Sequence, residues 1–224
     1  MLKTPIIIIN FKTYNESTGD NAIKLAEICN KLAEETKTSI AVAVQSTDIY
    51  KISKTVSIPV LSQHIDAISF GKNTGFLLPE SAKNAGAVAT LLNHSEHRLD
   101  FKVLKESIEK AKQAGLDVVA CAKDVEDAKK IAGLSPDFIA VEPPELIGGE
   151  ISISTAKPEV IENSVKAIKS INQNIKVLCG AGVKNADDVR KAMQLGSEGI
   201  LVASGIVKSE NQEEALRDLI IGLK

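Results

Sequence analysis

Ionisable side chains are concentrated in one short stretch of the sequence, directly after the apolar residues 88–92. The stretch reads Asn93-His94-Ser95-Glu96-His97-Arg98 and holds two imidazoles, a carboxylate and a guanidinium. A chain that only turned here would use Gly, Asn, Asp or Pro. Loops at strand ends carry function when a rigid scaffold holds them in place. The stretch is therefore a candidate functional site, and its chemistry depends on the fold that holds it.

Further candidates follow apolar stretches that are far away in the sequence. Asn10 and Lys12 come at the end of the first such stretch, and Glu142 comes at the end of the sixth. An ammonium, an imidazole and a carboxylate can together move protons and stabilise negative charge. This chemistry is available only if the fold brings the three distant segments together.

Small residues follow the last two apolar stretches. Gly180-Ala181-Gly182 comes after the seventh, and Ala203-Ser204-Gly205 comes after the eighth. Residues without bulky side chains let backbone N–H groups approach an anion closely. The two segments therefore predict a phosphate-binding site.

The elements that must position these residues follow from the hydrophobic pattern. Short apolar stretches rich in β-branched residues alternate with segments of helical period, which predicts alternating strands and helices. The expected strands cover residues 5–11, 40–44, 60–63, 87–92, 117–122, 137–142, 176–179 and 199–203. The clearest expected helices cover residues 20–36, 101–114, 124–132, 158–170, 185–195 and 210–223. Such alternation is typical of a parallel sheet whose strands are covered on both faces.

Eight strand–helix units could form an open doubly wound sheet or a closed (β/α)8 barrel. An open nucleotide-binding sheet usually has a glycine-rich turn after its first strand. Here Asn10-Phe11-Lys12-Thr13-Tyr14 follows that strand, and the next glycine is Gly19. We therefore predict an α/β fold with a closed parallel barrel, in a single domain covering residues 1–224. The reactive groups of such barrels come from the carboxyl ends of several strands.

Composition narrows the range of partners and compartments. The 224 residues are 44% hydrophobic and 25% charged, with a net charge of −2. This charge gives no basic surface for nucleic acid and no polybasic membrane patch, and no apolar run is long enough to span a bilayer. Three widely spaced cysteines within apolar segments fit buried thiols in a reducing compartment. Without a signal-peptide pattern at the N-terminus, we expect a cytoplasmic protein.

Three motifs of the chain resemble, in order and spacing, the triosephosphate isomerase family. They are Asn10-Phe11-Lys12, the stretch 93–98, and Val141-Glu142-Pro143-Pro144 leading to Ile147-Gly148. The resemblance covers the whole chain up to Ala203-Ser204. The short chain and its Pro-Pro-Glu-Leu-Ile segment are similar to the compact archaeal branch of the family.

The resemblance implies a TIM barrel that interconverts D-glyceraldehyde 3-phosphate and dihydroxyacetone phosphate through an enediol(ate), as in glycolysis and gluconeogenesis. It implies that Glu142 is the base that moves a carbon-bound proton and that His94 is a neutral electrophile beside the carbonyl. Lys12 would supply fixed positive charge, Asn10 would hold Lys12 and the substrate oxygens, and Glu96 would support Lys12. Proton transfer of this kind needs a base and an oxyanion stabiliser, so we expect no metal and no cofactor.

The resemblance also implies a set of residues that bind the substrate. In this sequence they are Asn10, Phe11, Lys12, Ile147, Gly148, Gly182, Ala203 and Ser204. The chain departs from the family in having Phe11 where Trp is usual and Gly180-Ala181-Gly182 where Gly-Gly-Ser is common, which removes a side-chain hydroxyl. It also has Gly148-Gly149-Glu150 where Gly-Thr-Gly is usual, and we expect Glu150 to point away from the substrate.

A long segment without regular periodicity runs from His64 to Pro79. Loops of this length in compact domains are usually functional. In the family the matching loop inserts into a neighbouring subunit beside its lysine, here Lys12. The resemblance therefore implies a homo-oligomer, a dimer or a tetramer, whose interface includes this loop.

Two other functions stay open at this stage. The chain could be another phosphate-handling barrel, such as an isomerase or synthase of phosphorylated ribosyl compounds, although such an enzyme would not need Lys12, His94 and Glu142 together. It could also bind sugar phosphates without converting them. A base opposite an electrophile has no purpose in a site that only binds, so the triose isomerase is favoured.

Overall fold

The computed structural model describes residues 2–143 and 153–223 and contains a closed barrel of parallel strands in the order β1 to β8. The strands are β1 (Ile6–Asn10), β2 (Ser39–Val44), β3 (Val60–Ser62), β4 (Ala89–Leu92), β5 (Asp117–Ala122), β6 (Phe138–Val141), β7 (Lys176–Cys179) and β8 (Gly199–Val202). The barrel closes where β8 pairs in parallel with β1, with Ile6 opposite Gly199. The predicted fold class is confirmed.

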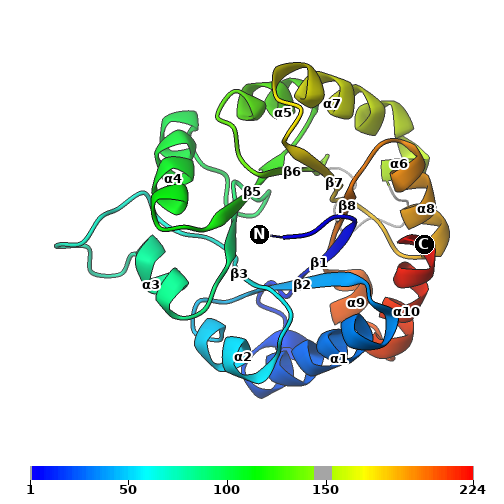
Figure 1. Cartoon of the computed structure of the whole chain (residues 1–224), viewed down its shortest axis with the longest axis horizontal. Coiled ribbons are helices and arrows are strands. Elements are labelled where there is room, and N and C mark those ends of the chain that lie inside the picture. The colour runs from blue at the N-terminus through cyan, green and yellow to red at the C-terminus, as the bar shows by residue number, and fades with distance from the viewer. Residues whose placement is uncertain (1, 144–152, 224) are drawn as a thin grey trace.

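The helices form a ring around the barrel (Figure 1). They are α1 (Asp20–Thr36), α2 (Ile49–Thr55), α3 (Pro79–Asn84), α4 (Phe101–Gln113), α5 (Val125–Ala132), α6 (Ile153–Ala156), α7 (Pro158–Ile171), α8 (Ala186–Gln194), α9 (Ser204–Val207) and α10 (Gln212–Leu223), together with the 3-10 turn η1 (Asn15–Ser17). The six helices expected from periodicity are all present. The hydrophobic pattern does not predict α2, α3, α6 or α9, because helices of four to seven residues are too short to show a period.

Side chains along each strand point alternately into the barrel and toward the helices, so the core has two layers. In β1, Ile6 and Ile8 belong to the cluster inside the barrel, whereas Ile7 and Ile9 belong to the cluster between the barrel and the helices. Successive side chains of a strand point to opposite faces. Both faces are therefore buried, which explains why the strands are apolar runs rather than alternating ones.

The segment between β3 and α3 projects beyond the ring of helices (Figure 1). It has no helix or strand between residues 63 and 78, as the sequence predicted. Two of its side chains, Phe70 and Phe76, are 75% and 60% exposed. This segment therefore presents apolar surface that the barrel does not cover.

Barrel closure gives a prediction about Gly199. Its φ is +152°, and a Cβ atom at this position would collide with the backbone oxygen of Ile6 on the neighbouring strand. We expect Gly199→Ala to lower the free energy of unfolding by about 3 kcal/mol or more, because strained backbone and overpacking add. Urea unfolding followed by circular dichroism measures the effect.

Gly115→Ala is the matched control. Gly115 also has a positive φ, +74°, but an added Cβ would meet no atom closer than 3.9 Å, an ordinary contact. It should cost only the backbone strain, about 1 kcal/mol. Equal losses in the two variants would show that the contact with β1 does not matter.

Candidate active site

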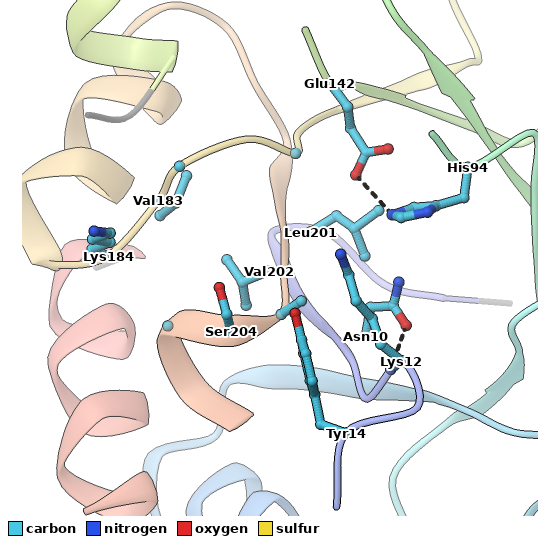
Figure 2. A pocket seen from close by; sticks show the side chains of 14 residues that line it. Asn10, Lys12, Tyr14, His94, Glu142, Val183, Lys184, Leu201, Val202 and Ser204 are labelled. Atoms are coloured by element: carbon cyan, nitrogen blue, oxygen red, sulfur yellow. Dashed lines mark hydrogen bonds and ion pairs between the residues drawn. The ribbon is translucent and has the colours of Figure 1, made fainter. Parts of the chain in front are cut away.

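One cavity lies at the carboxyl ends of the barrel strands and is lined by residues that follow several of them (Figure 2). Its described lining consists of Asn10, Lys12, Tyr14, His94, Glu142, Gly180, Gly182, Val183, Lys184, Leu201, Val202, Ala203, Ser204 and Gly205. The fold therefore brings together side chains that the sequence separates by more than a hundred residues.

Lys12 is held by its backbone as well as by its side chain. Its φ is +49°, an uncommon conformation for a residue with a side chain. The Asn10 side-chain oxygen accepts a hydrogen bond from the Lys12 N–H at 3.0 Å, and Gln63 donates to the Lys12 carbonyl at 2.9 Å. The Lys12 ammonium pairs with Glu96 at 2.8 Å. These contacts fix the cation at the edge of the cavity.

His94 is buried and is oriented by the chain that follows it. The backbone N–H of Glu96 donates to His94 Nδ1 at 3.2 Å. An Nδ1 that accepts a hydrogen bond assigns the ring proton of the neutral imidazole to Nε2. Burial lowers the pKa of His94 to about 4, and the positive charge of Lys12 acts in the same direction. The ring is therefore neutral near pH 7, with an N–H donor facing the cavity.

Glu142 directly follows β6, and its side chain is 3% exposed. It occupies the space beside Gly180, where a Cβ atom would lie 2.5 Å from Glu142 Cγ. Burial raises the pKa of Glu142 to about 7, while a hydrogen bond with the Cys121 thiol and the positive charges of Arg98 and Lys12 oppose that rise. The carboxylate is thus more basic than usual and still ionisable near neutral pH.

The side chains of His94 and Glu142 point toward one another at one end of the cavity (Figure 2). The distance from His94 Nε2 to Glu142 Oε1 is 3.8 Å. Because the imidazole is neutral, this contact is not an ion pair. A base and a hydrogen-bond donor this close to each other can act on adjacent atoms of a small carbonyl compound that contacts both, the base on a carbon-bound proton and the donor on the carbonyl oxygen.

The other end of the cavity is formed by small residues after β7 and β8. Gly182 has a φ of +69°, and Ala203 precedes the first turn of α9, which begins at Ser204. The first turn of a helix leaves backbone N–H groups without partners in the helix. This end is suited to an anionic group on the substrate.

The structure brings most of the expected site residues into this cavity. Asn10, Lys12, His94, Glu142, Gly182, Ala203 and Ser204 line it, and Glu96 contacts Lys12. Phe11 does not line it, because its side chain is fully buried in the cluster between the barrel and the helices. Ile147, Gly148 and Glu150 lie outside the described residues.

Several contacts of the site were not identified from the sequence. Tyr14 lines the cavity from the loop after β1, and Gln63 after β3 donates to the Asn10 side chain and the Lys12 carbonyl. Arg98 donates to the Cys121 carbonyl at 3.2 Å and lies 3.6 Å from Asp127. Tyr14 and Gln63 are polar residues that follow barrel strands, and this position in the sequence is the signal that could have identified them. No local pattern indicates the contact of Arg98.

None of the helices in the described part of the chain is long and apolar enough to cross a membrane.

Comparison with known proteins identifies close relatives over nearly the whole chain. A family model described as triosephosphate isomerase matches residues 5–220. A triosephosphate isomerase of Methanobacterium bryantii is 50% identical over 97% of this chain and 96% of its own length. One from Methanocaldococcus jannaschii is 49% identical over 96% of this chain and 98% of its own length. A third, from Methanosarcina acetivorans, is 46% identical over 97% of this chain and 98% of its own length.

The match of the family model and the extent of these identities show that the chain belongs to the triosephosphate isomerase family.

Proposed function

We propose that this protein interconverts D-glyceraldehyde 3-phosphate and dihydroxyacetone phosphate by proton transfer through an enediol(ate). The observation that carries the proposal is the opposition of a buried carboxylate and a neutral imidazole in one cavity, 3.8 Å apart. An isomerisation of this kind needs a base near the carbon-bound proton and a donor near the carbonyl oxygen.

In the proposed reaction, the Glu142 carboxylate removes a proton from the carbon next to the carbonyl. His94 Nε2–H donates to the carbonyl oxygen, which gains negative charge as the carbon–hydrogen bond breaks. The ammonium of Lys12 stabilises that charge. Glu142 then returns its proton to the neighbouring carbon, while His94 passes the hydroxyl proton from one substrate oxygen to the other, so that no atoms are gained or lost overall. The phosphate of the substrate would bind at the end formed by Gly182 and Ser204.

Replacing Glu142 with Asp tests the role of the base. The shorter side chain withdraws the carboxylate by about one bond length, and a displacement near 1 Å can cost about 100-fold in rate. We expect Glu142→Asp to lower kcat by about 100-fold or more with little change in KM, measured in a coupled assay with glyceraldehyde 3-phosphate.

Glu126→Asp, at an exposed position in the first turn of α5, is the matched control and should keep full turnover. If Glu142→Asp retained the activity of the control, Glu142 would not be the base. A wild-type chain without turnover would contradict the proposed function itself.

The raised pKa of Glu142 predicts a pH-dependent difference in stability. Burial raises this pKa from 4.5 to about 7. A raised carboxyl pKa favours the folded state while the group is protonated, and this contribution is lost as the pH rises through about 7. Glu142→Gln stays neutral at every pH. Its stability relative to wild type should therefore be greater at about pH 9 than at about pH 5, by up to about 3 kcal/mol.

Urea unfolding of both proteins at the two pH values measures this difference. Titrating groups that do not interact with Glu142 are common to the two chains and cancel in the comparison. A difference that is equal at the two pH values would mean that ionisation of Glu142 costs no stability in the folded protein.

We further propose that the protein is a homo-oligomer whose interface includes the segment from His64 to Pro79. Two observations support this: the exposure of Phe70 and Phe76, and a second cavity beside Lys12 that is lined by Gln63, His64, Glu96 and His97, among others. In this proposal the projecting segment of one subunit fills the second cavity of the other. The same contact would support the loop that carries Lys12.

Light scattering of a double variant, Phe70→Asp with Phe76→Asp, tests the interface. We expect a monomeric mass at micromolar concentration, because two buried carboxylates would oppose association. Ile221→Asp, which replaces another apolar residue with 60% exposure, is the matched control and should keep the wild-type mass. A wild-type monomer with full activity would contradict the proposal.

A further inference from the structure

Tyr14 enters the catalytic cavity from the loop after β1, two residues beyond Lys12. The residue follows β1 and precedes η1, and it lines the same cavity as His94, Glu142 and Ser204. Its ring rises from this loop so that the hydroxyl ends in the cavity, between Ser204 on one side and Asn10 and Lys12 on the other (Figure 2). The hydroxyl therefore reaches the end of the cavity that is formed by small residues.

The Tyr14 hydroxyl is free to bind a ligand. Among the residues that the structure describes, it has no hydrogen-bond partner, although the ring is partly buried against the core. Partly buried tyrosines usually direct their O–H group to a hydrogen-bond partner. A donor without a protein partner at the wall of a polar cavity is available for an anionic ligand.

The position of Tyr14 is fixed by both its backbone and its ring. The Tyr14 carbonyl accepts hydrogen bonds from the Ser17 N–H at 3.1 Å and from the Thr18 hydroxyl at 2.8 Å. The ammonium of Lys208, which directly follows α9, lies 5.1 Å from the centre of the ring. A cation at this distance from a ring face attracts it. The loop after β1 and the end of α9 thus hold the phenol in place before any ligand binds.

The described residues at this end of the cavity have few polar side-chain groups. Gly182, Ala203 and Gly205 have no side chain that can donate a hydrogen bond, so only their backbone N–H groups are available. Among the described lining residues, Ser204 and Tyr14 therefore supply the neutral side-chain donors at this end. The charge of Lys208, 5.1 Å from the centre of the Tyr14 ring, adds positive potential in the same region.

We propose that the Tyr14 hydroxyl donates a hydrogen bond to the phosphate group of the substrate and is a substrate-binding residue of this enzyme. This inference rests on the proposed function, because it places the phosphate of a triose at the end of the cavity near Ser204. Tyr14 has no part in proton transfer, which takes place at the other end, between Glu142 and His94. Its hydroxyl strengthens binding without altering the chemical step.

Tyr14→Phe removes only the hydroxyl and keeps the ring that contacts Lys208. A hydrogen bond from a neutral donor to a charged acceptor corresponds to about a tenfold change in affinity. We expect about a tenfold rise in the inhibition constant of inorganic phosphate and a similar rise in the KM of glyceraldehyde 3-phosphate, with kcat within about twofold. The value of kcat/KM for D-glyceraldehyde, which has no phosphate, should not change.

Tyr50→Phe is a closely matched control. Tyr50 is the other tyrosine of the chain, is 62% exposed on α2, and also has a lysine beside its ring, with Lys54 Nζ 5.7 Å from the ring centre. It lies outside the cavity, so both kinetic constants should stay at the wild-type values. If Tyr14→Phe gave the same constants as Tyr50→Phe, the proposal would be wrong. An equal loss with D-glyceraldehyde would also overturn it, because the tyrosine would then act on the whole site rather than on phosphate.

A measurement without turnover separates this inference from the proposed function. Bound phosphate raises the unfolding temperature of the folded protein by mass action. We expect inorganic phosphate to protect the wild type and Tyr50→Phe more than Tyr14→Phe at equal concentration. Absence of triose phosphate isomerisation by the wild type would refute the function, whereas equal protection of the three proteins would refute the role of Tyr14.

Discussion

Burial of the Glu142 carboxylate is the constraint on which the arrangement of the site depends. Removing a carboxylate from water makes its charged form costly and its proton affinity high. If Glu142 stayed fully protonated at neutral pH, it could not act as a base. If its carboxylate were fully hydrated, it would be only a weak base. The opposing charges of Arg98 and Lys12, with the Cys121 thiol, hold the pKa near 7. At that value the group combines a useful ionised fraction with high basicity.

The position of Glu142 follows from the same alternation that builds the barrel. Ala140, two residues earlier, points into the barrel, as does Leu178 on the neighbouring strand. Continuing each strand by two residues places Glu142 and Gly180 side by side at the mouth. The glycine is needed because the space of its side chain is taken by the Glu142 methylenes. The site is thus the last inward-facing layer of the core, with polar groups in place of apolar ones.

This dependence on alternation explains what the sequence could and could not predict. Local patterns in the sequence indicate the strands, the long helices and the residues that follow the strands. They are therefore enough to predict the barrel and the positions of Lys12, His94 and Glu142. Phe11 was assigned to the substrate from the family motif. Because side chains alternate between the two faces of a strand, Phe11 shares the outward face with Ile7 and Ile9. Its side chain lies on that face in the structure. The contacts of Gln63 with Lys12 and of Arg98 with Cys121 depend on barrel closure, and no local pattern contains that information.

The strained backbone of Lys12 shows how the cation is kept in position despite a flexible side chain. A φ of +49° for a lysine is costly and persists only where the surroundings determine it fully. Here the Asn10 oxygen binds the Lys12 N–H, and Gln63 binds its carbonyl. The ion pair with Glu96 adds less, because Glu96 is 58% exposed and such pairs are weakened by water. The position of the Lys12 backbone therefore depends mainly on hydrogen bonds from amide side chains, which salt does not screen, whereas the ammonium itself is held by the weaker pair with Glu96.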